Sequence, residues 1–218
     1  MKPMPPIRFS RTRLAWLDPF LRFVLRRRFR AVHVRGTLEW SSDAVHVLLV
    51  QHVGRYDGFV LRQLHRRDAG QSRLITVMLE SQLRRYPVFR GVGAVGIEPG
   101  SFGSGRTLLR RLRQDVRPGD CVAIYPQGRI ESVDADLRQI QTGFRHMAHP
   151  SIPTIFHPVA LSVEALHHPR PTVFMQAGPP VDVNRAADAF AETVDHLRAF
   201  LRRNGESSAE RWEGARLL

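Results

Sequence analysis

The chain has 218 residues, of which 43% are hydrophobic, so it is long enough for one domain with a substantial core. Its formal net charge of +13 favours an anionic partner, such as nucleic acid, a membrane surface or an acidic substrate. Cys121 is the only cysteine and lies in an apolar run, which excludes a disulfide framework or a cysteine metal site within the chain and fits a reducing compartment.

Residues 11–30 follow a helical pattern after a proline-containing lead-in over residues 1–10. Asp is a good N-cap and Pro a favoured first helical residue, so the pair Asp18-Pro19 predicts two short helices, 11–17 and 19–29, with Asp18 on the polar side. Trp and Phe on one face and Arg on the other suit a membrane–water interface. An ordinary helix pair packed on the core suits the pattern equally well. The side chains that would contact a membrane are Trp16, Leu17, Phe20, Phe23 and Val24.

Two features of the sequence bear on how the chain meets a membrane. No run of about 18 apolar residues is present, so we expect no transmembrane helix. The N-terminal apolar segment is interrupted by Arg and Pro and lacks a small-residue cleavage site, so we expect no signal peptide.

Apolar runs and helical patterns then alternate along the chain. Strands are expected at 31–36, 44–50, 74–79, 94–97, 121–125, 154–163 and 172–177. Helices are expected at 57–67, 80–89, 105–116, 139–149 and 184–203, the last with Asn184 as its cap. This alternation predicts a single α/β domain with a mostly parallel sheet flanked by helices. The expected divisions are 1–30 for the amphipathic helices, 31–204 for the α/β domain and 205–218 for a flexible tail.

The turn between the expected strand 44–50 and the expected helix 57–67 holds His52 and Asp57. Asp57 could cap the helix, or its carboxylate could reach back to one imidazole nitrogen of His52. In the second case the other nitrogen would be a base able to take a proton from a hydroxyl. Chance supplies about 0.5 such His–Asp pairs in a chain of this composition, so the spacing alone leaves both interpretations open.

Four blocks in chain order carry a family resemblance. They are His52-x4-Asp57 with its lead-in Val34-Arg35-Gly36, Tyr-Pro-Val-Phe-Arg-Gly-Val-Gly-Ala-Val-Gly-Ile at 86–97, Ile-Tyr-Pro-Gln-Gly-Arg at 124–129, and Ile-Pro-Thr-Ile-Phe-His-Pro-Val-Ala at 152–160. Over about residues 30–177 the chain resembles the glycerolipid acyltransferase superfamily, typified by 1-acyl-glycerol-3-phosphate (lysophosphatidate) acyltransferases.

The resemblance implies acyl transfer from acyl-CoA or acyl carrier protein, each a co-substrate and not a bound cofactor, to the hydroxyl of a lipid acceptor. His52 would be the general base and Asp57 would orient it, with no covalent acyl-enzyme. A backbone N–H near Gly128 could help to hold the oxyanion. The expected location is cytoplasmic, peripheral on the inner face of the cell membrane, with the N-terminal helices docked on the lipid.

Two of the blocks depart from the family pattern. Glu98-Pro99 replaces Asp-Arg, so the expected phosphate-binding Arg is missing, and Gln127 and Arg129-Ile130 replace Glu and Thr-Arg. We therefore expect an acceptor other than lysophosphatidate, such as a glycolipid, an acylated amino acid or another hydroxylated lipid. Arg could still clamp a phosphate. The candidate acceptor-binding residues are Arg55, Tyr56, Gly96, Glu98, Arg106, Gln127, Gly128 and Arg129. Gln127 also fits a simple turn residue, and Arg55 and Tyr56 could merely solvate the loop.

Other functions are less well supported. His157, His167 and His168 have no carboxylate or Cys partner at ligand spacing, so we expect no metal site. Nucleic-acid binding would need an Arg stripe with interleaved aromatics, and we expect none. The changes at Gln127 and Pro99 leave open a catalytically silent relative that binds lipid or carrier protein, against which the His52–Asp57 pair argues.

Overall fold

The computed structural model describes residues 7–70, 72–98, 105, 108, 112–137 and 140–218. Within these residues eight strands form one sheet in the order β4-β3-β5-β2-β6-β7-β1-β8. The strands are β1 Ala31–Arg35, β2 Val45–Val50, β3 Leu74–Leu79, β4 Ala94–Ile97, β5 Cys121–Ile124, β6 Thr154–Glu164, β7 Thr172–Ala177 and β8 Ala215–Arg216. All neighbouring strands are parallel except the pairs β6–β7 and β1–β8. The predicted α/β fold with a mostly parallel sheet is confirmed.

Strand β2 is the central strand, as its apolar run predicted, and all six of its residues are buried. It lies between β5 and β6 and is parallel to both. The register pairs Leu49 with Ile124, so β2 and β5 end at the same edge of the sheet. The loops that follow these two strands therefore begin side by side.

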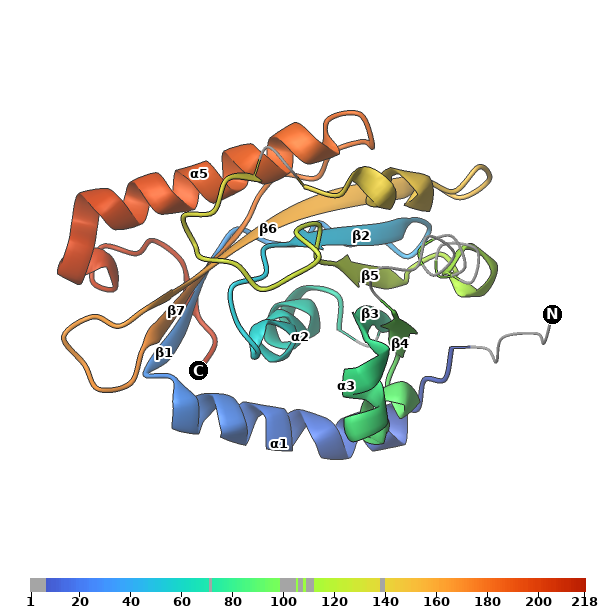
Figure 1. The fold of residues 1–218 in the computed structure, drawn as a ribbon, viewed down its shortest axis with the longest axis horizontal. Helices are drawn as coiled ribbons and strands as arrows, with labels where there is room; N and C mark the ends of the chain where they lie inside the picture. Colours follow the sequence, from blue (N-terminus) through green and yellow to red (C-terminus); the bar gives the residue numbers. More distant parts are fainter. Residues whose placement is uncertain (1–6, 71, 99–104, 106–107, 109–111, 138–139) are drawn as a thin grey trace.

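Helices cover both faces of the sheet (Figure 1): α5, Ala186–Asn204, lies on one face and α2, Asp57–Asp68, on the other. Side chains of β2 alternate between the two sides, as the strand pleat requires. Val47 joins the core cluster that contains Phe190 of α5, and Leu48 joins the cluster that contains Leu61 of α2. Helix α1, Arg11–Arg28, packs outside α2.

The predicted break at Asp18-Pro19 is wrong, because α1 is one continuous helix with Pro19 inside it. Its N-cap is Ser10, whose hydroxyl accepts the backbone N–H of Arg13. Asp18 faces inward instead of lying on the polar side, and it is buried against Arg62 of α2. Two hydrogen bonds of 2.9 and 2.8 Å join the guanidinium of Arg62 to the carboxylate of Asp18. This tertiary ion pair holds the helix across a proline that removes one backbone hydrogen bond.

Several shorter elements differ in their limits from the predictions. The helix expected at 80–89 divides into α3, Glu80–Arg85, and a 3-10 helix, Pro87–Gly91, as proline at the break requires. The helix expected at 139–149 is a 3-10 helix, Thr142–Met147. Of the helix expected at 105–116, residues 105, 108 and 112–115 are helical, Val116 is not, and the others lie outside the described residues.

Two predictions at the C-terminal end of the domain also change. Asn184 does not cap α5, because Arg185 occupies the N-cap position and the carboxylate of Asp182 accepts the N–H groups of Asn184 and Arg185. Residues 205–218, expected as a flexible tail, form a 3-10 helix at Gly205–Ser208 and the strand β8, which pairs with β1. The Trp212 side chain is buried in the core, which fixes this segment against the sheet.

Candidate active site

The loop between β2 and α2 brings His52 and Asp57 into direct contact. Oδ2 of the Asp57 carboxylate lies 2.8 Å from Nδ1 of His52. The same oxygen accepts the backbone N–H groups of Val53 at 2.7 Å and Gly54 at 2.8 Å. Tyr56 is the N-cap of α2 and makes no side-chain cap bond. Of the two interpretations left open by the spacing, the carboxylate that reaches back to His52 is the one observed.

This geometry decides which imidazole nitrogen of His52 can act as a base. A carboxylate only accepts hydrogen bonds, so Nδ1 of His52 carries the proton and Nε2 holds the lone pair. Asp57 is buried, whereas the His52 side chain is 25% exposed and can be reached from outside. The imidazole ring packs on Tyr125 with the ring centroids 4.5 Å apart. Burial raises the pKa of Tyr125 far above its usual value, so its phenol stays neutral beside the pair.

A second loop, after β5, exchanges hydrogen bonds with His52. The side-chain oxygen of Gln127 accepts the backbone N–H of His52 at 2.5 Å, and the backbone N–H of Glu131 donates to the His52 carbonyl at 3.0 Å. Gln127 is buried, and its amide nitrogen donates to Oε2 of Glu131 at 3.2 Å. Gln127 is therefore a connecting residue of the site and not simply a turn residue.

Gly128 has the role in the turn that its glycine predicted, but its amide is already used. Its φ of +71° lies in the region that favours glycine. Its backbone N–H donates to the carbonyl of Tyr125 at 3.0 Å. This conformation does not offer the amide of Gly128 itself to an oxyanion, and an oxyanion contact by another backbone N–H near Gly128 stays a prediction.

Glu131 is the residue of this site that the sequence analysis missed. Its carboxylate accepts from Nε of Arg129 at 2.7 Å and from the amide of Gln127. These two hydrogen bonds, first from Arg129 and then from Gln127, hold the pKa of Glu131 below its usual value, so it is ionised at neutral pH. The only signal in the sequence was its position four residues after Gln127 and two after Arg129.

Gly96 and Glu98, two of the remaining predicted acceptor-binding residues, do not join this cluster. Gly96 lies in β4, where it packs against the carboxylate of Glu80, and the exposed Glu98 follows it, 3.5 Å from Arg84. Two strands, β3 and β5, separate β4 from β2, a lateral distance of about 14 Å. Arg55 is exposed in the first loop. Arg106 lies outside the described residues.

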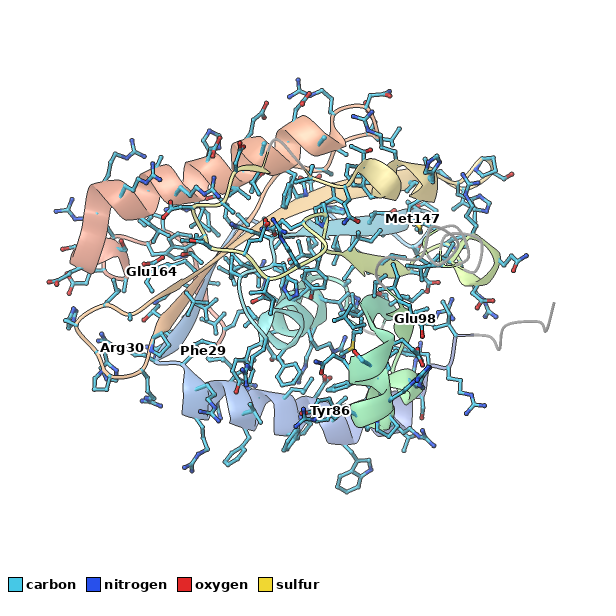
Figure 2. The ribbon with its side chains drawn as sticks, in the orientation of Figure 1. Phe29, Arg30, Tyr86, Glu98, Met147 and Glu164 are labelled. Atoms are coloured by element: carbon cyan, nitrogen blue, oxygen red, sulfur yellow. The ribbon has the colours of Figure 1, made fainter. Side chains whose placement is uncertain are left out.

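Tyr56 belongs to a row of aromatic rings beside α1 instead of facing His52. Successive ring centroids are 5.8 to 6.4 Å apart through Phe29, Tyr56, Phe59, Phe89 and Tyr86. Figure 2 shows the two ends of this row, Phe29 and Tyr86, at different points along α1. Tyr56, next to Asp57, and Phe59 pack against the core cluster that contains Phe29, whereas Tyr86 at the other end of the row is 44% exposed.

The outer side of α1 exposes large aromatic side chains. Trp16 is 80% exposed, and Phe20 and Phe23 are each 57% exposed. Their spacing of four and three residues places them on one face of the helix, while Leu17 and Val24 are half-buried at its margins. None of the helices within the described residues has the length and hydropathy needed to cross a bilayer.

Other reactive side chains lie away from this site. Cys121 is buried in β5, as predicted, and burial raises the pKa of its thiol to about 12. His157 is buried 3.0 Å from His46, nitrogen to nitrogen. In the part of the chain that the structure describes, no group of three His, Cys, Asp or Glu side chains could hold a metal ion.

Comparisons with known proteins place the fold. No protein-family profile and no curated protein sequence matches the chain. Among solved structures, the chain is similar to the 1-acyl-sn-glycerophosphate (LPA) acyltransferase PlsC from Thermotoga maritima, with a TM-score of 0.57 and 16% sequence identity. The similarity covers 92% of this chain and 81% of the other. This likeness shows that the chain has the fold of that acyltransferase.

Proposed function

We propose that this protein is an O-acyltransferase, which moves a fatty acyl group from acyl-CoA or acyl carrier protein to the hydroxyl of a lipid acceptor. His52 is the general base and Asp57 orients it. The proposal is supported by the resemblance of the four sequence blocks and by the fold shared with an LPA acyltransferase. The two co-substrates are the donor and the acceptor, and the reaction needs no bound cofactor.

The observation that carries the proposal is the hydrogen bond between Nδ1 of His52 and Oδ2 of Asp57. Because Oδ2 also accepts two backbone N–H groups, the carboxylate is held in place before any substrate binds. The imidazole is thereby held with Nε2 as the acceptor on a partly exposed ring. Such an arrangement is suited to taking a proton from a hydroxyl that approaches from outside.

In the reaction the acyl group moves from the sulfur of the thioester donor to the hydroxyl oxygen of the acceptor. Nε2 of His52 removes the proton of the acceptor hydroxyl as its oxygen attacks the thioester carbonyl carbon. The C–S bond of the tetrahedral intermediate then breaks, and the imidazolium returns the proton to the leaving thiolate. Asp57 stabilises the imidazolium between these steps. General-base assistance of this kind contributes about 10²–10⁴-fold.

The exposed aromatic face of α1 supplies the contact with the membrane in this proposal. Trp16, Phe20 and Phe23 would enter the interface between lipid head groups and acyl chains. Arg27, whose guanidinium lies 5.8 Å from the ring centre of Phe23, would favour anionic lipid. The protein would then act as a peripheral enzyme on the inner face of the cell membrane.

The test is acyl transfer from radiolabelled acyl-CoA and from acylated carrier protein into a total lipid extract. The wild-type protein should form a labelled lipid, and His52→Ala should lower the rate by about 10²-fold or more. His167→Gln is the matched control, because this exposed histidine lies in the connection between β6 and β7. Absence of a labelled product with both donors, or equal rates in wild type and His52→Ala, would refute the proposal.

A further inference from the structure

The orientation of the Gln127 amide is determined by its two partners. The backbone N–H of His52 can only donate, so it must face the oxygen of the Gln127 side chain. The NH₂ group then faces Oε2 of Glu131, which can only accept at neutral pH. A carboxylate at position 127 would satisfy His52 but would repel Glu131. Glutamine at position 127 therefore provides both the acceptor that the His52 N–H needs and the donor that the Glu131 carboxylate needs.

The Glu131 carboxylate keeps hydrogen-bonding capacity for a ligand. A carboxylate has about four acceptor positions, and Gln127 and Arg129 occupy two of them. The Glu131 side chain is 18% exposed, whereas its partner Arg129 is 78% exposed and extends into solvent. The backbone N–H of Glu131 is bound to the carbonyl of His52, so Glu131 lies against the backbone of the residue proposed as the base.

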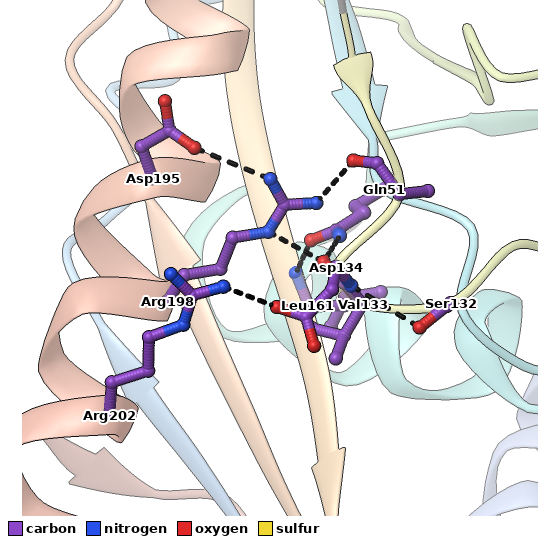
Figure 3. A network of polar contacts seen from close by, with 9 residues as sticks. Gln51, Ser132, Val133, Asp134, Leu161, Asp195, Arg198 and Arg202 are labelled. Carbon is purple, nitrogen blue, oxygen red and sulfur yellow. Dashed lines mark hydrogen bonds and ion pairs between the residues drawn. The ribbon is translucent and has the colours of Figure 1, made fainter.

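The segment that carries Glu131 is held from behind by three side chains (Figure 3). Arg198 of α5 donates to the carbonyls of Val133 at 2.6 Å and Ala135 at 2.7 Å. Gln51, which is buried, donates to the carbonyl of Val133 and accepts the backbone N–H of Leu161 in β6. Arg202 pairs with Asp134 at 2.8 Å. The loop is thus fastened to α5 and to the sheet at Val133, Asp134 and Ala135, which follow Glu131.

We propose that Glu131 is a specificity-determining residue, which selects acceptor head groups that carry hydroxyl or ammonium donors over head groups that end in a phosphomonoester. The inference rests on the proposed function, because it concerns the acceptor of the same reaction. A fixed carboxylate accepts hydrogen bonds from hydroxyl and ammonium groups and repels the two negative charges of a phosphomonoester. Gln127 holds this carboxylate in position and leaves its charge intact.

The experiment measures acyl transfer to three pure acceptors: monoacylglycerol, lysophosphatidylethanolamine and lysophosphatidate. The wild-type protein should favour the first two over lysophosphatidate. Glu131→Gln retains an oxygen for the Gln127 amide but removes the charge, so the preference should fall by about tenfold, the size expected for one charged hydrogen bond. Glu206→Gln is the matched control, since it neutralises an exposed carboxylate outside both loops and should leave the preference unchanged.

A second variant separates specificity from damage to the fold. Gln127→Glu places two carboxylates in contact, so turnover relative to wild type at the same pH should fall at pH 8 and approach the wild-type value near pH 5, where the two can share a proton. The double variant Gln127→Glu/Glu131→Gln should recover turnover at pH 8, because it restores one amide and one carboxylate. Acceptor preference separates the two roles: the double variant should keep the weakened preference of Glu131→Gln, whereas a merely structural role for Glu131 would restore the preference together with turnover.

The outcomes distinguish the two proposals. Transfer to one or more acceptors with a preference that is the same in wild type and Glu131→Gln would overturn the inference and leave the acyltransferase proposal in place. A wild-type preference for lysophosphatidate would overturn it in the same way. No transfer to any of the three acceptors or to the lipid extract would overturn both. Thermal unfolding of each variant shows whether a lost rate reflects a lost fold.

Discussion

Replacing Asp57 by asparagine should remove one charge from the site and keep its hydrogen bonds. Three N–H groups converge on Oδ2, from His52, Val53 and Gly54. Two of them are backbone groups that cannot turn around, so they require an oxygen at this point. Asparagine would place its amide oxygen there, and Nδ1 of His52 would keep its proton. Asp57→Asn therefore reports the charge of the carboxylate separately from the geometry it imposes.

The size of this effect follows from the distance between the two groups. The charge of an imidazolium on His52 is spread over the ring, so it lies about 4 Å from the Asp57 carboxylate, and the attraction at an effective dielectric constant of 20 is about 4 kcal/mol. Partial exposure of His52 reduces this value. Since about 1.4 kcal/mol is a factor of ten in rate, we expect kcat to fall by about 10²–10³-fold.

The assay is steady-state acyl transfer with the acceptor found in the lipid screen, at saturating and at limiting acceptor. The loss should appear in kcat, because the charge matters only once the proton has moved to His52. The double variant with His52→Ala should be no slower than His52→Ala alone, since Asp57 acts through His52. A fall of less than tenfold for Asp57→Asn, or a further fall in the double variant, would refute this account of the site.

Two further predictions concern stability and membrane binding. Burial lowers the pKa of His65 to about 3 and that of His157 to about 4. Below about pH 6.5 the unfolded chain takes up a proton at each histidine while the folded protein does not. Each histidine should therefore lower the free energy of unfolding by about 1.4 kcal/mol for every pH unit below that value, and neither lowers it above about pH 6.5. Chemical denaturation between pH 7 and 5 should show this slope, and His167→Gln, which changes an exposed ring, should not alter it. Replacing Trp16 and Phe20 by serine should lower partition onto anionic vesicles by at least tenfold without changing the unfolding temperature by more than a few degrees. Equal vesicle binding in wild type and variant would show that the aromatic face of α1 is not the membrane contact.

The sheet could be predicted from the sequence because its buried strands appear there as short apolar runs. The run that ends at Val50 is apolar at almost every position, as a strand covered on both faces requires, and it forms β2 one residue shorter than expected. The strand at 74–79 has the predicted limits. Each of these strands is a short, mostly apolar run, and the neighbouring strands supply its backbone hydrogen bonds.

The errors occurred where a distant residue decides the local structure. Asp18-Pro19 has the local chemistry of a helix start, but Arg62, 44 residues away, takes the carboxylate of Asp18 into a buried ion pair. The C-terminal segment has no strong periodicity, yet β8 pairs with β1 and the Trp212 ring lies against Arg35, 4.5 Å from its guanidinium carbon. Neither contact can be read from the residues near it in the sequence.

The candidate site also has a part formed by residues close in sequence and a part held by distant residues. The first is the turn with His52 and Asp57, and the second is the loop after β5. His52 and Asp57 belong to one six-residue turn, so they can meet without help from a distant element; their spacing left two interpretations open, and the structure shows the pairing. The loop after β5 depends on partners from other elements, including Gln51 and Arg198, and its residues depart most from the family pattern. A resemblance is therefore informative about the proton transfer and much less informative about the acceptor. Under the proposed function, the acceptor is to be tested first against the second loop, where the backbone of Glu131 contacts His52.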